Sequence, residues 1–312
     1  MKFAIIGAGG TGGVLGGYLA HAGNDVTFLA RGRHLQAMQE NGLLIRTNHR
    51  GDIRIPKVKA CTMDEYLQAK ETPDVLFVCV KYYSLPDAIE FARHAAGKET
   101  LIIPILNVFG SGAVMQEKLP GLTALDGCIY VFAKIAEPGV IAQPQSILRV
   151  FYGFRPGQSQ ELSGKARELE ATLRAADIHA HFTDQIQRDA LTKFSFVSPM
   201  GAAGLYYGAK SDEFQHPGEV RETFIGLIQE VQALGEAMGI TFDRDLVANG
   251  LKLMDAFAPG LTTSMQRDVE KGGPSEFTGL VDRIVALGQE YHVATPLYAK
   301  ISAWGHEKGL AR

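Results

Sequence analysis

Residues 2–12 read KFAIIGAGGTG, an apolar run that passes directly into a G-x-G-x-x-G pattern with glycines at positions 7, 9 and 12. A strand that feeds into this pattern is typical of a dinucleotide-binding βαβ unit. Gly7 permits the tight turn, Gly9 lets the backbone approach a pyrophosphate, and Gly12 lets the following helix, roughly residues 11–22, pack closely on the strand. The pyrophosphate is expected on the N–H groups at the start of that helix.

The end of the second predicted strand, residues 25–29, indicates which cofactor is bound. NAD-binding proteins usually have Asp or Glu there, which accepts hydrogen bonds from the adenosine ribose. This chain has Arg31 and Arg33 instead, and no acid between Asp25 and Glu40. Guanidinium groups suit a 2′-phosphate, so the sequence favours NADP(H). Without the glycine pattern, two solvated loop arginines would be the better interpretation.

The composition is that of an ordinary globular protein. The 312 residues are 46% hydrophobic and carry a formal net charge of −3, so no basic surplus indicates a nucleic-acid or membrane partner. No apolar run is long enough to span a bilayer, and the many glycines between positions 7 and 17 argue against a signal peptide. Scattered cysteines indicate a reducing cytoplasm, and no metal site is predicted, because His179-Ala180-His181 lacks a third ligand.

The first half of the chain alternates strand and helix patterns, which predicts a doubly wound sheet. Continuous apolar runs are typical of strands that are buried on both faces. The predicted strands are residues 75–80, 101–106, 130–133, 147–152 and 179–182, and a helix is predicted over 162–176. Pro104 weakens the second of these predictions, because proline cannot donate to a strand ladder.

From about Asp184 onward the pattern is helical. Apolar residues between Val220 and Met238 recur at helical spacing before Gly239, a further helix is predicted after Pro274, and Thr295-Pro296 can start the last one. We therefore predict an NADP-binding Rossmann-type domain over residues 1–183 and an all-helical substrate domain over residues 184–312, which would close over the ligand crevice of the first.

Further residues with chemical potential follow in order along the chain: Val80-Lys81, Asn107 with Gly110, Lys193, and Ser264-Met265 followed by Glu276. With the glycine pattern and Arg31, this ordered set resembles the ketopantoate reductase (2-dehydropantoate 2-reductase) family over essentially the whole chain. The resemblance implies a Rossmann domain followed by a helical domain, with NADPH and substrate between them. It also implies NADPH-dependent reduction of a 2-oxo acid to a 2-hydroxy acid, in cytoplasmic pantothenate biosynthesis.

The resemblance implies roles for these side chains. Lys193 matches the general acid that protonates the substrate carbonyl, and Glu276 matches the glutamate that binds substrate and aligns that lysine. Asn107 and Ser264 match substrate-binding residues. Lys81 and Asn107 match residues that contact the cofactor. The apolar neighbours of Lys193 suit it to proton donation. Each residue has an ordinary alternative: a solvated or snorkelling lysine, a turn asparagine, a solvated serine, or an acid at a helix start.

Two positions depart from the family pattern. Ketopantoate reductases usually carry asparagines four and eight residues after the catalytic lysine, where this chain has Val197 and Gly201, with Ser198 and Pro199 between them. The change removes amides that contact substrate and should leave room at the distal end of the pocket. We therefore expect ketopantoate to be a poor substrate, unless Ser198 or a residue after Pro274 supplies the missing hydrogen bond.

Two alternatives stay open at this point. One is a family member that reduces another branched or aromatic 2-oxo acid. The other is a protein that senses NADPH without catalysis, although Lys193 and Glu276 together count against it. The expected partner is a small-molecule 2-oxo acid. A homodimer is compatible with the sequence, which does not fix the oligomeric state.

Overall fold

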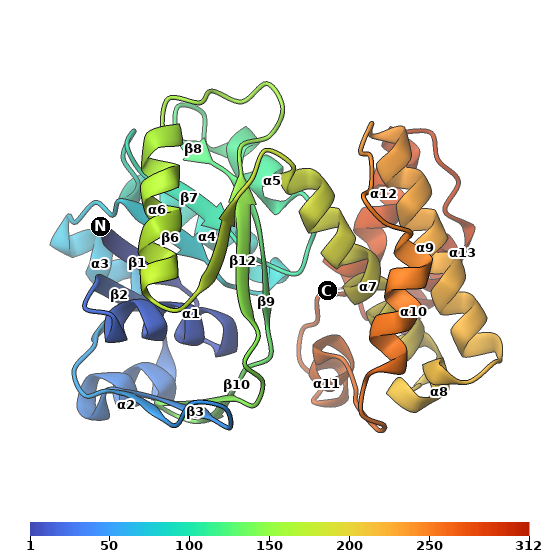
Figure 1. The fold of residues 1–312 in the computed structure, drawn as a ribbon, viewed down its shortest axis with the longest axis horizontal. Coiled ribbons are helices and arrows are strands. Elements are labelled where there is room, and N and C mark those ends of the chain that lie inside the picture. Colours follow the sequence, from blue (N-terminus) through green and yellow to red (C-terminus); the bar gives the residue numbers. More distant parts are fainter. Residues whose placement is uncertain (312) are drawn as a thin grey trace. The chain divides into compact units, whose positions relative to one another are not determined.

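The structure is a computed structural model that describes residues 1–311. The chain divides into two compact units. The first comprises Met1–Val80, Ser84–Leu106 and Gly110–Ile186, and the second comprises Lys81–Tyr83, Asn107–Phe109 and the chain from Gln187 onward. Figure 1 shows a sheet with covering helices in the first unit and helices alone in the C-terminal part of the chain, which confirms the predicted fold class.

The first unit is built on a six-stranded parallel sheet in the order β5-β2-β1-β6-β7-β8. This is the strand order of a Rossmann sheet, with its switch point between β1 and β6. The strands are β1 (Lys2–Ile6), β2 (Asp25–Leu29), β5 (Lys59–Cys61), β6 (Val75–Val78), β7 (Leu101–Pro104) and β8 (Thr123–Ala124). Pro104 is tolerated because β8 pairs only with Leu101 and Ile102, so the missing N–H falls past the end of that ladder.

The helices of the first unit alternate with its strands along the chain and help to bury them. They are α1 (Gly10–His21), α2 (Gly32–Asn41), α3 (Met63–Ala69), α4 (Leu85–Ala95), α5 (Ser111–Lys118) and α6 (Ser163–Ala175), with a short 3₁₀ turn η1 (Tyr82–Ser84). All residues of β6 and β7 are buried, as expected for strands covered on both faces. The core of the unit therefore lies on the two faces of the parallel sheet.

Two smaller sheets complete the first unit. One has the order β10-β11-β3-β4, and the other has the order β13-β12-β9. Their strands are β3 (Leu43–Thr47), β4 (Ile53–Ile55), β9 (Asp126–Val131), β10 (Lys134–Glu137), β11 (Val140–Gln143), β12 (Leu148–Gly153) and β13 (His179–Phe182). The strand predicted over 130–133 begins earlier and ends at Val131, and the first of these sheets was not anticipated from the sequence.

The second unit is helical. Its elements are α7 (Ile186–Tyr207), α8 (Ser211–Gln215), α9 (Glu219–Ala237), α10 (Leu246–Asp255), α11 (Ser264–Glu270), a π-helical turn η2 (Thr278–Asp282), α12 (Arg283–Glu290) and α13 (Pro296–Glu307). The predicted apolar stripe of α9 is buried, and Gly239 follows that helix with φ +77°. Thr295 precedes α13 without capping it through its side chain. Instead the buried Glu230 carboxylate accepts the N–H groups of Leu297 and Tyr298.

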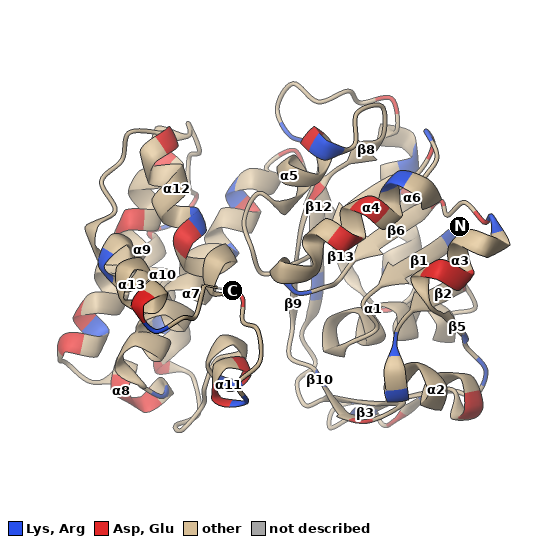
Figure 2. Cartoon of the chain, turned by 180° about the vertical axis from the view of Figure 1, so that it is seen from behind, with Lys and Arg blue, Asp and Glu red and all other residues tan. Residues whose placement is uncertain are grey.

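Charged residues are scattered over both units. Figure 2 shows acidic and basic positions interspersed along the helices of each unit. None of the described helices is long and apolar enough to cross a membrane. Within residues 1–311, no group of three or more His, Cys, Asp or Glu side chains could hold a metal ion.

Candidate active site

The glycine loop, residues 7–12, has the backbone shape that its sequence predicts. Gly7 has φ +89°, a conformation that favours glycine. A Cβ on Gly12 would lie 2.2 Å from the Gly7 carbonyl oxygen, so a larger residue cannot pack there. A Cβ on Gly9, the residue before α1, would meet no atom within 4 Å. The loop is thus tightly packed toward the protein and open at Gly9, which fits a dinucleotide pyrophosphate at a helix N-terminus.

Two arginines follow β2 at the start of α2. Arg31 and Arg33 are exposed, and within the part of the chain that the structure describes neither forms an ion pair. The next residue along the chain, His34, contacts the glycine loop: its Nε2 lies 2.9 Å from the Ala8 carbonyl oxygen, and its Nδ1 accepts the Gly139 N–H at 3.1 Å. Because Nδ1 is an acceptor, Nε2 carries the proton. Burial lowers the pKa of His34, although the hydrogen bond to Ala8 opposes this, so the ring is neutral around pH 7.

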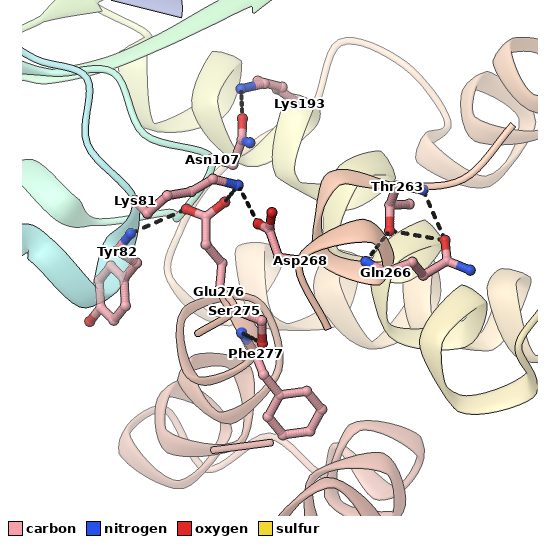
Figure 3. A network of polar contacts seen from close by, with 10 residues as sticks. All are labelled: Lys81, Tyr82, Asn107, Lys193, Thr263, Gln266, Asp268, Ser275, Glu276 and Phe277. Atoms are coloured by element: carbon pink, nitrogen blue, oxygen red, sulfur yellow. Dashed lines mark hydrogen bonds and ion pairs between the residues drawn. The ribbon is translucent and has the colours of Figure 1, made fainter. Parts of the chain in front are cut away.

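In the helical unit, Lys193 and Asn107 meet. Lys193 lies on α7, is only 8% exposed, and donates from Nζ to Asn107 Oδ1 at 2.8 Å. The ring of Phe109 lies 6.3 Å from that of Phe194, which fixes the segment of Asn107 against α7. Because its oxygen accepts from the lysine, Asn107 presents its NH₂ group to any other partner. The structure thus brings two predicted site residues into contact, and both the Lys193 ammonium and the Asn107 NH₂ group can donate hydrogen bonds (Figure 3).

A second group of charges forms the lysine–carboxylate cluster, which we define as Lys81, Asp268 and Glu276. Lys81 Nζ lies 3.0 Å from Glu276 Oε2 and 3.0 Å from Asp268 Oδ2 (Figure 3). The other oxygen of Glu276 accepts the Tyr82 N–H at 3.2 Å. The Glu276 side chain is 2% exposed, so its oxygens are bound by these protein groups rather than by bulk water. Burial disfavours the charge of Lys81, but the charge of Glu276 and the contact with Asp268 outweigh it, and the pKa of Lys81 is raised.

A close backbone approach brings these segments together. Gly279 lies in η2, and a Cβ there would sit 2.5 Å from Val108 Cγ2 and 2.8 Å from the ring of Tyr82. The residues after Lys81 and Asn107 therefore both pack on one glycine of the π-helical turn that follows Glu276. π-Helical turns are frequent at functional sites. Here the turn follows Glu276 closely in sequence and packs against the segments 81–83 and 107–109.

Ser264 begins α11, and Asp268 lies one turn later on the same face, because residues at i and i+4 are neighbours on a helix. A capping box between Thr263 and Gln266 defines the start of this helix. The amide of Gln266 also donates to the carbonyls of Gly204 and Ala209, just at and beyond the end of α7. Ser264 is therefore held on the face of a fixed helix that also carries Asp268.

Ser198 and Gly201, in the stretch that departs from the family pattern, are packed differently from our expectation. Ser198 donates from Oγ to the Leu280 carbonyl at 2.5 Å and lies 2.6 Å from the Tyr298 hydroxyl, and it is fully buried. Its hydroxyl group therefore forms hydrogen bonds within the protein interior. A Cβ on Gly201 would lie 3.1 Å from Met265 Cε. The expectation that Gly201 leaves room was wrong at this position, because Met265 occupies the space.

Sequence reasoning missed Asp268, Gly279 and Tyr298. The signal for Asp268 was its spacing of four residues from Ser264, which places both on one helix face. Gly279 and Tyr298 left no such signal, because their contacts depend on residues far away in the chain.

A Rossmann sheet with an open glycine loop, combined with a helical unit that carries paired lysine, amide and carboxylate groups, is typical of two-domain nicotinamide-dependent oxidoreductases. Two family models match the chain: Ketopantoate reductase PanE/ApbA over residues 3–154, and Ketopantoate reductase PanE/ApbA C terminal over residues 185–308. The chain belongs to the ketopantoate reductase family, as its ordered motifs predicted.

Relatives match the chain from end to end. It is 26% identical to "Uncharacterized oxidoreductase YkpB" of Bacillus subtilis (strain 168), over 99% of this chain and 100% of that protein. It is 26% identical to 2-dehydropantoate 2-reductase of Pyrococcus abyssi, over 99% of this chain and 97% of that protein. A solved structure of D-mandelate dehydrogenase with NADH and anilino(oxo)acetate superposes with a TM-score of 0.87 at 21% identity, covering 99% and 98% of the two chains.

Proposed function

We propose that this protein reduces a 2-oxo acid to a 2-hydroxy acid with NADPH, as 2-dehydropantoate 2-reductases do. The observation that carries the proposal is the hydrogen bond from the buried Lys193 ammonium to Asn107 at 2.8 Å. It places a proton donor and an oriented amide side by side. The same unit contains Glu276 and Lys81, and a protein that only sensed the cofactor would need none of these groups.

The side chains divide the work as follows. Lys193 donates a proton to the substrate carbonyl oxygen, a role worth about 10²–10⁴-fold in rate for a positioned acid. Asn107 donates from its NH₂ group to a substrate oxygen, because its own oxygen is bound to Lys193. Ser264 binds the substrate carboxylate, and Glu276 contacts substrate and keeps Lys81 charged.

The glycine loop and Arg31 hold the cofactor in this proposal. When bound, the nicotinamide group supplies the hydride. Gly7, Gly9 and Gly12 admit the pyrophosphate, and Lys81 and Asn107 contribute cofactor contacts. The exposed guanidinium of Arg31 binds the 2′-phosphate, which supports NADPH over NADH. D-Mandelate dehydrogenase, which shares the fold, was solved with NADH, so both cofactors belong in the test.

A second candidate substrate class is a branched or aromatic 2-oxo acid that lacks a terminal hydroxyl. The observation that favours it lies on α7: the side chains of Val197 and Gly201 have no hydrogen-bond donor, and the Ser198 hydroxyl already donates to the Leu280 carbonyl. A site without hydrogen-bonding groups for a terminal hydroxyl gains little from that hydroxyl. An aryl 2-oxo acid analogue is bound in the D-mandelate dehydrogenase structure, which supports testing this class.

The experiment is oxidation of NADPH, and of NADH, followed with ketopantoate and a series of branched and aromatic 2-oxo acids. Turnover of at least one of them supports the proposed reaction. A kcat/KM for ketopantoate about tenfold or more above the others, roughly 1.4 kcal/mol, would establish the plain family activity. Tight NADPH binding without turnover of any of these 2-oxo acids would instead favour a protein that senses NADPH without catalysis.

A further inference from the structure

Lys81 is held by two carboxylates that come from different elements. Asp268 projects from α11, whereas Glu276 lies just before η2, and both oxygens are 3.0 Å from Nζ. The side chains of Lys81 and Asp268 are 34% and 28% exposed. These charges are thus only partly screened by water, and their interaction is stronger than that of a surface pair.

The two carboxylates act on different parts of the same segment. Glu276 binds both the ammonium of Lys81 and the backbone N–H of Tyr82, so it fixes the segment itself. Among the residues that the structure describes, the Asp268 carboxylate contacts only the ammonium of Lys81. A lysine has a long flexible stem, and a second contact from another direction restricts where its charged end can lie.

We propose that Asp268 is a positioning residue of the reductase: from α11 it holds the Lys81 ammonium in place against Glu276. This inference rests on the proposed function, because Asp268 acts on the reaction only through Lys81. Ser264 lies on the same face of α11, so one fixed helix sets the place of both Ser264 and the Lys81 ammonium.

Asp268 also places a second negative charge beside the lysine. The cluster contains two carboxylates and one ammonium, and a 2-oxo acid brings a further negative charge. Replacing Asp268 by asparagine keeps the size of the side chain and removes one charge that repels the substrate. Substrate binding should therefore be unchanged or tighter, while the lysine loses its position. A merely structural role would have the opposite signature, a raised KM together with lower stability.

The test compares Asp268→Asn and Asp268→Glu with the control Glu270→Gln. Glu270 is an exposed acid on the same helix, so its replacement makes the same change of charge. Asp268→Asn should lower kcat about 10- to 100-fold, the scale of a misplaced functional group, with KM for the 2-oxo acid unchanged or lower. Asp268→Glu should recover part of kcat, and Glu270→Gln should match the wild type. A wild-type kcat in Asp268→Asn, or a raised KM with a lowered melting temperature, would overturn the proposal.

A second measurement does not depend on activity. Lysines labelled as ¹³C-dimethyl derivatives are titrated by NMR, with the Lys81 signal assigned by its loss in Lys81→Arg. The pKa of Lys81 should be lower in Asp268→Asn and unchanged in Glu270→Gln, because one of two neighbouring carboxylates is removed. An unchanged pKa in Asp268→Asn overturns the proposal. If the pKa falls but the wild type reduces no 2-oxo acid, the proposed function fails, while the link between Asp268 and Lys81 stands.

Discussion

The glycine loop and the lysine–carboxylate cluster are built in opposite ways. The loop occupies six consecutive residues, 7–12, and works through side chains that are absent, because a Cβ at Gly12 would collide with the Gly7 carbonyl oxygen. The cluster works through side chains that are present, and the bond between Lys81 and Glu276 spans 195 positions of sequence. A site formed by the backbone therefore depends on neighbouring residues, whereas a site formed by charged side chains depends on the whole fold.

The largest expected effect concerns the helical unit. Lys193→Ala should lower turnover by about two to four orders of magnitude, because a positioned proton donor is lost. NADPH affinity should be nearly unchanged, since we assign cofactor binding to the glycine loop and its neighbours. Steady-state kinetics and a cofactor titration measure the two effects, and Lys98→Ala, at an exposed lysine, serves as control. A variant that keeps most of its turnover would remove Lys193 from the mechanism.

The glycine loop offers a matched pair of substitutions. Gly12→Ala should cost about 1–3 kcal/mol of stability, because the added methyl group overpacks a site where the Gly7 oxygen lies 2.2 Å away. Gly9→Ala should change stability by less than about 0.5 kcal/mol, since the added methyl group meets open space, yet it should weaken NADPH binding. Denaturant unfolding and cofactor titration separate the two. Equal stability loss in both variants would contradict the division between a packed and an open side of the loop.

Arg31 tests the cofactor preference. Arg31→Ala should weaken NADPH binding about tenfold or more and leave NADH binding nearly unchanged, because a charge-assisted contact to the 2′-phosphate is lost. Arg54→Ala, at an exposed arginine on β4, should affect neither cofactor. Dissociation constants for both cofactors decide the matter. A wild-type preference for NADH would refute the assignment.

The smallest effect is a pH dependence of stability. The pKa of His34 is lowered by burial, so the unfolded chain binds this proton more tightly than the folded one. The stabilisation is therefore present above the unfolded pKa, about 6.5, and is lost as pH falls toward the folded value, at no more than about 1.4 kcal/mol per pH unit. The free energy of unfolding, measured between pH 7 and 5, should depend less steeply on pH in His34→Gln than in the wild type or in His49→Gln. Identical slopes would show that His34 does not contribute.

How much the sequence predicted follows the same division. The strand before Gly7, the turn and the packing at Gly12 could be read directly, because each depends on neighbouring residues. The helical stripe of α9 was predictable for the same reason. The sheet formed by β10, β11, β3 and β4 was not, since it joins segments far apart in the chain.

The candidate site residues of the helical unit were proposed from their order along the chain, but the sequence did not predict which of them contact one another. The pairing of Lys193 with Asn107 spans 86 positions, and that of Ser198 with Tyr298 spans 100. Such contacts depend on tertiary packing. The sequence suggested that Ser198 could serve a ligand and that Gly201 made space, but the buried Leu280 carbonyl and Met265 take up both.

The two three-residue segments that fold with the helical unit limit how this protein can be recombined. A chimera joined at Ile186 would take Lys81 and Asn107 from one parent and Glu276, Asp268 and Lys193 from the other. Each contact of the charged groups would then join residues of different ancestry. A functional exchange of the C-terminal half must therefore transfer residues 81–83 and 107–109 as well, although the gene encodes them within the first half.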